Sequence, residues 1–237
     1  MCGRYWLKSE KKVIVNEFNI YEVVTEVKPD YNITPGRNVL CVTKNGNNKL
    51  VSMRWGLIPS WAKDEQIGYR TINARAESLS EKPSFLRPFQ TQRCLVIADG
   101  FYEWSNVAKG SADGARKQGK DKTPLAVRLK NKKPFGFAGL YDRWQSPKGE
   151  LITSCTIITT EPNELISPIH NRMPAILTTD AREIWLDRNL SDPYKLMSLL
   201  IPFDADEMES YEVSSLVNSV KNNSPNLIEP VGKSTLF

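Results

Sequence analysis

Short apolar runs and alternating patterns, rather than long helical stripes, dominate the chain and predict a protein built mostly from β-strands. Residues 40–44 and 49–55 flank Asn45-Gly46, which is a strong hairpin signal because both residues tolerate positive φ. Further strands are predicted at 94–98, 125–129, 135–141, 151–159 and 211–214.

A few segments have helical spacing instead. Ser9 can cap a helix that runs to Phe18, and a second helix is predicted at 180–187. A third begins at Pro193 and ends near Pro202. Together these elements predict an α+β fold, in which a single domain is built on a mostly antiparallel, barrel-like β-sheet with a few peripheral helices.

No break in composition divides the chain, so we predict one domain over residues 1–237. A polar, Gly- and Lys-rich stretch at about 105–122 lies between predicted strands, and we expect it to be a flexible insert. Hydrophobic residues make up 40% and charged residues 25%, which is ordinary for a soluble globular protein. The chain shows neither a membrane-length apolar run nor a readable signal peptide, so we expect a cytoplasmic location.

The chain has four widely spaced cysteines and one histidine, without a Cys-x-x-Cys pair. This spacing argues against a zinc site and, in a reducing cytosol, against disulfides, so we expect no metal. The net charge of +5 permits nucleic-acid binding without establishing it. Arginines that neighbour aromatic residues or prolines are the better indication, because they combine phosphate donors with stacking surfaces. They include Arg4, Arg54, Arg70, Arg87 and Arg172.

Cys2 follows the initiator methionine and is small enough for Met1 to be removed. Removal would give Cys2 both a thiol and an α-amine, whose reference pKa values are about 8.5 and about 7.7–8.0. Such a pair can close a five-membered ring on an aldehyde, which no internal residue can do. The alternative is that Cys2 is a small apolar residue at the start of a strand.

Three other polar residues are candidates for chemistry. Glu103 lies between Tyr102 and Trp104 after an apolar strand, where desolvation should raise its pKa and suit a general acid or base. His170 lies in an irregular segment framed by prolines, and Asn73 could donate hydrogen bonds. The alternatives are a surface glutamate, a histidine hydrogen-bonded within a loop, and a turn asparagine.

The chain carries several uncommon motifs in fixed order. They are MCGRY at 1–5, YNITPG at 31–36, RWGLIPSWA at 54–62, TINARAES at 71–78, ADGFYEW at 98–104, PIHNRMP at 168–174 and SVKNNSPNLIEPV at 219–231. By these motifs the chain resembles the SOS response-associated peptidase (SRAP) family, which senses abasic sites in single-stranded DNA. The resemblance spans nearly the whole chain, and an ordered set of motifs is far more specific than any one of them.

The resemblance implies self-removal of Met1, followed by a covalent thiazolidine crosslink between Cys2 and the ring-opened abasic sugar, which shields the site from strand cleavage. It assigns Asn73 to positioning, Glu103 to acid–base work on the Schiff base, and His170 to protonation and to crosslink reversal. It also implies a weak strand-cleaving lyase activity. No cofactor is implied, and we expect a monomer whose partner is single-stranded DNA containing abasic sites.

The resemblance also assigns residues to DNA binding. Arg4, Arg75 and Arg172 match positions near phosphates, Trp61 matches one that stacks on bases, and Asn32 and Pro35 match a loop lining the cleft. Two departures matter. Asn171 replaces an acidic residue found in some relatives, which favours a neutral His170. Ala62 replaces a second aromatic beside Trp61, which weakens one stacking surface.

Two other functions remain open from the residues themselves. A Met-Cys-Gly start also occurs in N-terminal-nucleophile amidohydrolases of the glutamine amidotransferase type, where the thiol attacks an amide within an αββα sandwich. A non-catalytic DNA-binding module, in which Cys2 is structural, is the third candidate.

Overall fold

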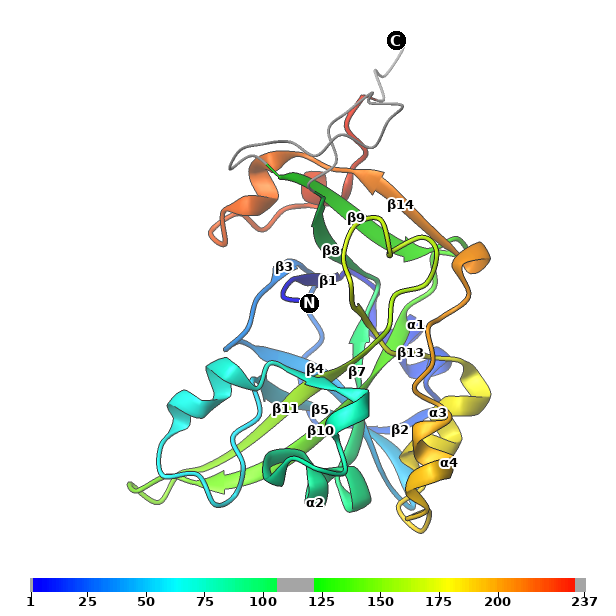
Figure 1. Cartoon of the computed structure of the whole chain (residues 1–237). Coiled ribbons are helices and arrows are strands. Elements are labelled where there is room, and N and C mark those ends of the chain that lie inside the picture. The colour runs from blue at the N-terminus through cyan, green and yellow to red at the C-terminus, as the bar shows by residue number, and fades with distance from the viewer. Residues whose placement is uncertain (1, 106–121, 233–237) are drawn as a thin grey trace.

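Five strands close into a barrel at the centre of the computed structural model, which describes residues 2–105 and 122–232 (Figure 1). Neighbouring strands pair antiparallel, except that β5 returns to β11 in parallel, with Arg54 opposite Ser154 and Trp55 opposite Cys155. Closure leaves these strands without an open edge. The barrel strands are β4 (Asn38–Asn45), β5 (Asn47–Trp55), β7 (Arg93–Ala98), β10 (Phe135–Gln145) and β11 (Leu151–Thr160).

The barrel interior is filled by apolar side chains and thiols. The Cys41 and Cys155 sulfurs lie 3.8 Å apart across the lumen. The Phe137 ring meets the Tyr5 ring edge-on, with centroids 5.8 Å apart. Gly139 is required by close packing, since a Cβ there would lie 3.0 Å from the Cys94 sulfur. The strands therefore surround a packed core rather than a pore.

Four short strands extend the barrel sheet beyond its closed ring. The strand that contains Asn73 and Arg75 pairs in parallel with the upper part of β11, with Asn73 opposite Ile157 and Arg75 opposite Thr159. This pairing places Asn73 beside the barrel rim although its segment lies far from β11 in sequence. The four strands are β2 (Ile20–Val23), β6 (Asn73–Arg75), β12 (Met173–Pro174) and β13 (Ile176–Leu177).

A second, five-stranded antiparallel sheet stands above the barrel in Figure 1, in the order β14-β9-β8-β1-β3. It is joined to the barrel through Asp99, which lies between β7 and β8. The Asp99 carboxylate accepts from the Ser9 backbone N–H at 2.7 Å and so anchors the chain after β1. The strands are β1 (Tyr5–Leu7), β3 (Asp30–Ile33), β8 (Gly100–Ser105), β9 (Thr123–Leu129) and β14 (Met208–Glu212).

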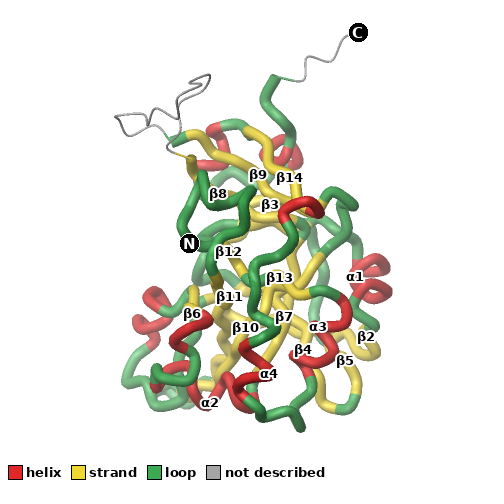
Figure 2. The backbone as a smooth tube through the Cα atoms, turned by 45° about the vertical axis from the view of Figure 1, so that its right-hand side comes forward, coloured by secondary structure: helices red, strands yellow, loops and turns green. Residues whose placement is uncertain are grey.

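Helices lie around the outside of the strands (Figure 2). Trp185 anchors the third of them to the barrel, because its indole N–H donates to the Cys94 carbonyl at 3.0 Å. The α-helices are α1 (Lys11–Glu17), α2 (Pro83–Thr91), α3 (Thr179–Leu186) and α4 (Pro193–Met197). Short 3-10 turns occur at η1 (Glu65–Arg70), η2 (Ala76–Ser78), η3 (Ala205–Glu207), η4 (Ser215–Asn218) and η5 (Pro225–Ile228). Within the described residues, no helix is both long and apolar enough to cross a membrane.

The predicted fold class is confirmed: a mixed, mostly antiparallel barrel fold with peripheral helices. This fold differs from the αββα sandwich that the amidohydrolase alternative requires, and it therefore argues against that alternative. The predicted insert lies almost entirely outside the described residues, and the domain bounds 1–237 stay a prediction.

Two details differ from the sequence-based expectation. Ser9 does not cap α1, because its hydroxyl donates to Asp99 and Glu10 is the N-cap residue. The helix that begins at Pro193 ends at Met197, short of Pro202. At Gly100, where β8 begins, the missing side chain leaves room for the Trp6 indole, which a Cβ would meet at 2.1 Å.

Candidate active site

Cys2 precedes β1 and lies at the junction of the two sheets. Its side chain is fully buried, and its carbonyl accepts a 2.8 Å hydrogen bond from the Asn73 side-chain Nδ2. Burial raises the pKa of the Cys2 thiol, and the negative charge of Glu103 raises it further. The thiol is therefore protonated at neutral pH, and it lies within electrostatic range of a carboxylate.

Glu103 lies on β8, opposite Leu125 of β9. Its side chain is only 5% exposed, because β8 is covered on both faces. Burial raises the pKa of this carboxyl group, as the sequence predicted from its aromatic neighbours. A carboxyl with a raised pKa can both accept and return a proton near neutral pH.

His170 lies in the segment between β11 and β12. Its Nδ1 accepts a 3.0 Å hydrogen bond from the Arg172 backbone N–H, so the proton of the neutral ring is on Nε2. Partial burial lowers the pKa of His170, and the Lys122 charge lowers it too. Lys122 also acts on Glu103, where burial raises the pKa and Lys122 offsets part of the rise. The two groups thus lie near the same cation, although β8 belongs to the upper sheet.

Four sequence-predicted residues are therefore gathered from both sheets. Cys2 lies just before β1 of the upper sheet, and Glu103 lies on β8 of the same sheet. Asn73 lies on β6, and His170 lies in the segment between β11 and β12. The Asn73 Oδ1 atom is buried and has no hydrogen-bond partner among the described residues, so it can accept one more donor.

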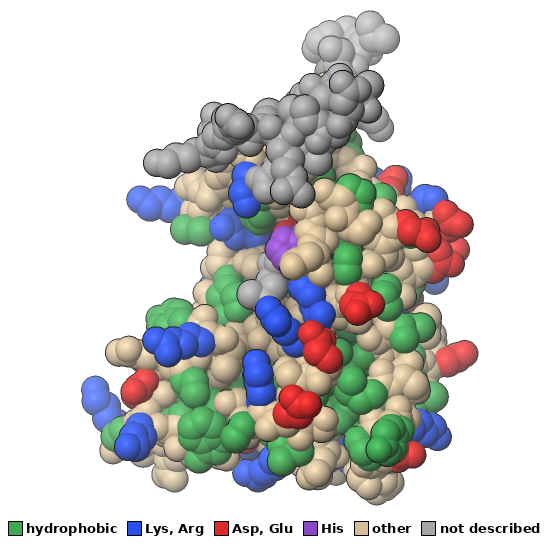
Figure 3. All heavy atoms as spheres, in the orientation of Figure 1, with side chains coloured by type: hydrophobic (Ala, Val, Ile, Leu, Met, Phe, Trp, Pro, Cys, Tyr) green, Lys and Arg blue, Asp and Glu red, His purple; other side chains and the backbone are tan. Residues whose placement is uncertain are grey.

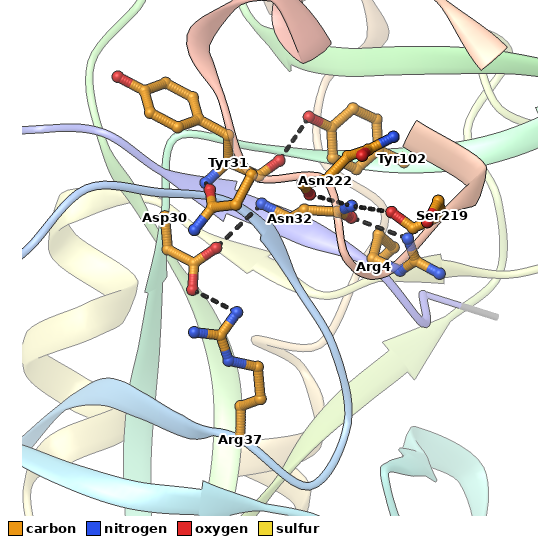
Figure 4. Close-up of polar contacts among 9 residues, drawn as sticks. Arg4, Asp30, Tyr31, Asn32, Arg37, Tyr102, Ser219 and Asn222 are labelled. Carbon is orange, nitrogen blue, oxygen red and sulfur yellow. Dashed lines mark hydrogen bonds and ion pairs between the residues drawn. The ribbon is translucent and has the colours of Figure 1, made fainter. Parts of the chain in front are cut away.

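Arg4 and Asn32 form a polar network that joins the start of the chain to its last described segment (Figure 4). The Arg4 Nη1 donates to Asn32 Oδ1 and to the Val217 carbonyl, each at 2.8 Å. Asn32 is fully buried, and its Nδ2 donates to the Ser219 and Asn222 carbonyls at 3.0 and 2.8 Å. Asn32 therefore ties its own strand to the 217–222 segment from within rather than presenting its side chain at the surface.

Arg172 forms a bidentate ion pair with Glu77, at 2.9 Å from Nη1 to Oε1 and 2.8 Å from Nη2 to Oε2. Its Nη2 also donates to the Thr159 carbonyl at 2.6 Å. Glu77 was not singled out from the sequence. An Arg and a Glu that lie 95 residues apart give no local sign that they will pair.

The remaining predicted DNA-binding residues are more accessible. Trp61 is 58% exposed and Arg75 is exposed at the end of β6, while Pro35 is partly exposed in a turn. Tyr69, the aromatic neighbour of the predicted Arg70, is 65% exposed and lies on the same 57–71 segment as Trp61. On the face shown in Figure 3, Lys and Arg side chains gather across the middle of the molecule.

The loop that carries Trp61 and Tyr69 is firmly attached. Its ends meet where the Thr71 hydroxyl donates to the Leu57 carbonyl at 2.5 Å. Gly56 and Gly68 touch backbone to backbone, because a Cβ on Gly56 would lie 2.6 Å from the Gly68 oxygen. The exposed aromatics are thus held on a fixed support.

Within residues 2–105 and 122–232, no group of three or more His, Cys, Asp or Glu side chains is arranged to hold a metal ion.

Comparison with known proteins gives the following. A family model described as SOS response associated peptidase (SRAP) matches residues 1–220. The abasic site processing protein YoqW of Bacillus subtilis is 52% identical over 232 residues, covering 97% of this chain and 99% of that protein. The abasic site processing protein YoaM of the same species is 48% identical, covering 97% and 98%. A crystal structure of a protein from Bacteroides thetaiotaomicron has a TM-score of 0.84 at 30% identity, covering 97% and 99%.

Proposed function

The chain belongs to the SOS response-associated peptidase (SRAP) family, and on that premise we propose that it processes abasic sites in single-stranded DNA. In this proposal, loss of Met1 exposes the Cys2 amine, and Cys2 then forms a thiazolidine with the ring-opened abasic sugar. The relatives YoqW and YoaM carry the name abasic site processing protein, which supports the substrate class.

One observation carries the proposal: a hydrogen bond from Asn73 fixes the Cys2 backbone beside the buried carboxyl group of Glu103. A cysteine that served only as a small apolar residue would not need a polar side chain to hold its carbonyl. The other side-chain atom of Asn73, the acceptor Oδ1, is buried and can receive an N–H of the Cys2 α-amine. Both arrangements suit a residue whose backbone amine reacts.

Formation of the thiazolidine crosslink releases one molecule of water. The α-amine adds to the C1′ aldehyde, and the carbinolamine loses water to give a Schiff base. The Cys2 sulfur then bonds to the same carbon while its proton ends on the nitrogen. Because burial raises the pKa of both Cys2 and Glu103, the thiol arrives protonated and the carboxyl can relay that proton. Self-removal of Met1, in which water cleaves the Met1–Cys2 peptide bond, and a weak lyase activity belong to the same proposal.

His170 acts as the proton donor to the opening sugar oxygen and takes part in crosslink reversal. Its lowered pKa and its Nδ1 acceptor role support a neutral ring that donates from Nε2. A neutral donor adds no positive charge beside the amine that must react.

DNA binding is assigned to the residues around this centre. Trp61, joined by Tyr69, stacks on bases, and Arg75 contacts a phosphate. Arg4 and Arg172 contribute positive charge from tethered positions, since each already donates to protein acceptors. Asn32 and Pro35 shape the cleft, Asn32 from the interior.

A crosslinking assay tests the proposal. The protein is mixed with a single-stranded oligonucleotide carrying one abasic site, then heated and denatured. We expect a stable adduct whose mass equals the chain without Met1 plus the DNA minus one water. The adduct should be lost in Cys2→Ala and kept in Cys94→Ala, a matched buried cysteine in the barrel. A stable adduct in Cys2→Ala, or one that retains Met1, would contradict the mechanism.

A further inference from the structure

The ion pair between Glu77 and Arg172 joins two parts of the site that the chain keeps far apart. Glu77 lies in η2, directly after the strand that carries Asn73, and Arg172 lies two residues after His170. Each guanidinium Nη atom donates to one carboxylate oxygen, Nη1 to Oε1 at 2.9 Å and Nη2 to Oε2 at 2.8 Å. A fork-to-fork pair of this kind fixes orientation as well as distance.

The Arg172 backbone extends the connection to the imidazole. The Arg172 backbone N–H donates to His170 Nδ1 at 3.0 Å, and the Arg172 side-chain Nη2 donates to the Thr159 carbonyl at 2.6 Å. Arg172 is therefore held at three places: by Glu77, by the end of β11, and by the ring whose tautomer it sets.

We propose that Glu77 is a positioning residue that clamps Arg172 and thereby fixes the ring orientation and tautomer of His170 relative to Asn73. The role assigned to His170 rests on the proposed function, but the clamp itself does not. Glu77 does not touch the reacting atoms and acts only through Arg172.

The geometry favours a clamp over an ordinary surface ion pair. The Arg172 side chain is only 12% exposed, whereas the Glu77 side chain is 56% exposed. Without Glu77, the two Nη atoms would keep only the Thr159 carbonyl, and the guanidinium would turn toward water. Because Glu77 is more than half exposed, the ion pair itself contributes little to folding. Its removal should thus disturb the site without unfolding the chain.

The molecule supplies a matched control. Arg54 and Glu65 form a second ion pair between a mostly buried arginine and a half-exposed glutamate, with side chains 21% and 51% exposed. That pair attaches the 57–71 loop rather than the His170 segment. Glu65→Ala therefore removes a similar interaction without acting on the clamp.

The test uses the fact that His170 is the only histidine in the chain, so its ring signals need no assignment. Long-range 1H–15N spectra of the free protein are recorded at a pH where the ring is neutral. We expect wild type and Glu65→Ala to show an unprotonated Nδ1 and a protonated Nε2. Glu77→Ala should show mixed tautomers, and Glu77→Gln, which keeps one acceptor for Arg172, should lie between. A Glu77→Ala spectrum identical to wild type would overturn the inference.

The crosslinking rate on abasic single-stranded DNA provides the functional measurement. At saturating DNA we expect Glu77→Ala to slow it about tenfold, since small displacements of a positioned group are costly, while Glu65→Ala, which acts on the loop that binds DNA, leaves the saturated rate unchanged. An equal loss in both variants would also overturn the clamp. If wild type fails to crosslink at all, the proposed function fails, and the spectra of the free protein still decide the clamp.

Discussion

The buried centre around Cys2 and the exposed surface around Trp61 are built on opposite principles. Cys2, Asn73 and Glu103 act on one another, so their geometry and proton affinities are set within the protein. Trp61 and Arg75 are exposed at the surface. Strand β6 joins the two, because it carries Asn73 at one end and Arg75 at the other.

In the proposed function, this difference separates reaction from binding. The contacts of the centre form within the protein itself, whereas the exposed surface would gain its stacking and charge partners only from bound DNA. Substitutions in the centre should therefore change rates, and substitutions on the surface should change affinities.

The sharpest test of this separation is Glu103→Gln. An amide keeps the size of the side chain but cannot relay a proton, so crosslinking should slow by about 10²–10⁴-fold. Affinity for the same single-stranded DNA should stay within about twofold in a filter-binding titration, because a carboxyl group 5% exposed makes little contact with a ligand. A joint loss of rate and affinity would break the comparison.

Trp61→Ala tests the exposed surface, and its expected effect is smaller. Loss of one stacking surface costs about 1–3 kcal/mol, which is about 5–150-fold in affinity for single-stranded DNA. At saturating DNA the crosslinking rate should match wild type. Tyr194→Ala removes an exposed aromatic, 86% accessible on α4, and should leave both quantities unchanged. Equal affinity in wild type and Trp61→Ala would remove Trp61 from the binding surface.

The smallest effect is a pH-dependent one, and it needs no DNA. Because burial raises the pKa of Glu103 in the folded state, the folded chain holds a proton that the unfolded chain releases above about pH 4.3. The free energy of unfolding should therefore fall as pH rises from there to the folded pKa. Glu103→Gln has no such proton to lose. In urea titrations its free energy of unfolding should therefore increase relative to that of wild type as the pH rises. A constant difference across pH would show that the carboxyl is not held protonated.

The sequence predicted the strands better than it predicted how they close. The Asn45-Gly46 hairpin and the run at 135–141 follow from turn chemistry and local apolar patterns, and both appear as strands. The parallel contact between Trp55 and Cys155 could not be read from either segment, because pairing across 100 residues leaves no local pattern. Helix α2 was missed because Pro88 lies inside it, where proline normally argues against a helix.

At the site, the sequence predicted the chemically unusual residues, but it did not predict the contacts that hold them in place. Glu103 stood out among aromatics, and its raised pKa agrees with that expectation. The ion pair to Glu77 and the burial of Asn32 depend on contacts that only the folded chain creates. Asn32 was expected at the cleft surface because its motif carries no signal of the three carbonyls that receive its amide.

The hydrogen bond from Arg4 to the Val217 carbonyl spans 213 positions of the chain. A ribosome releases residue 4 long before residue 217, so during synthesis the segment next to Cys2 emerges without this partner. Contacts of such separation form late in folding, because a long loop must close before they stabilise anything. The order of synthesis therefore delays assembly of the site around Cys2, whose surroundings are completed only when nearly the whole chain is present.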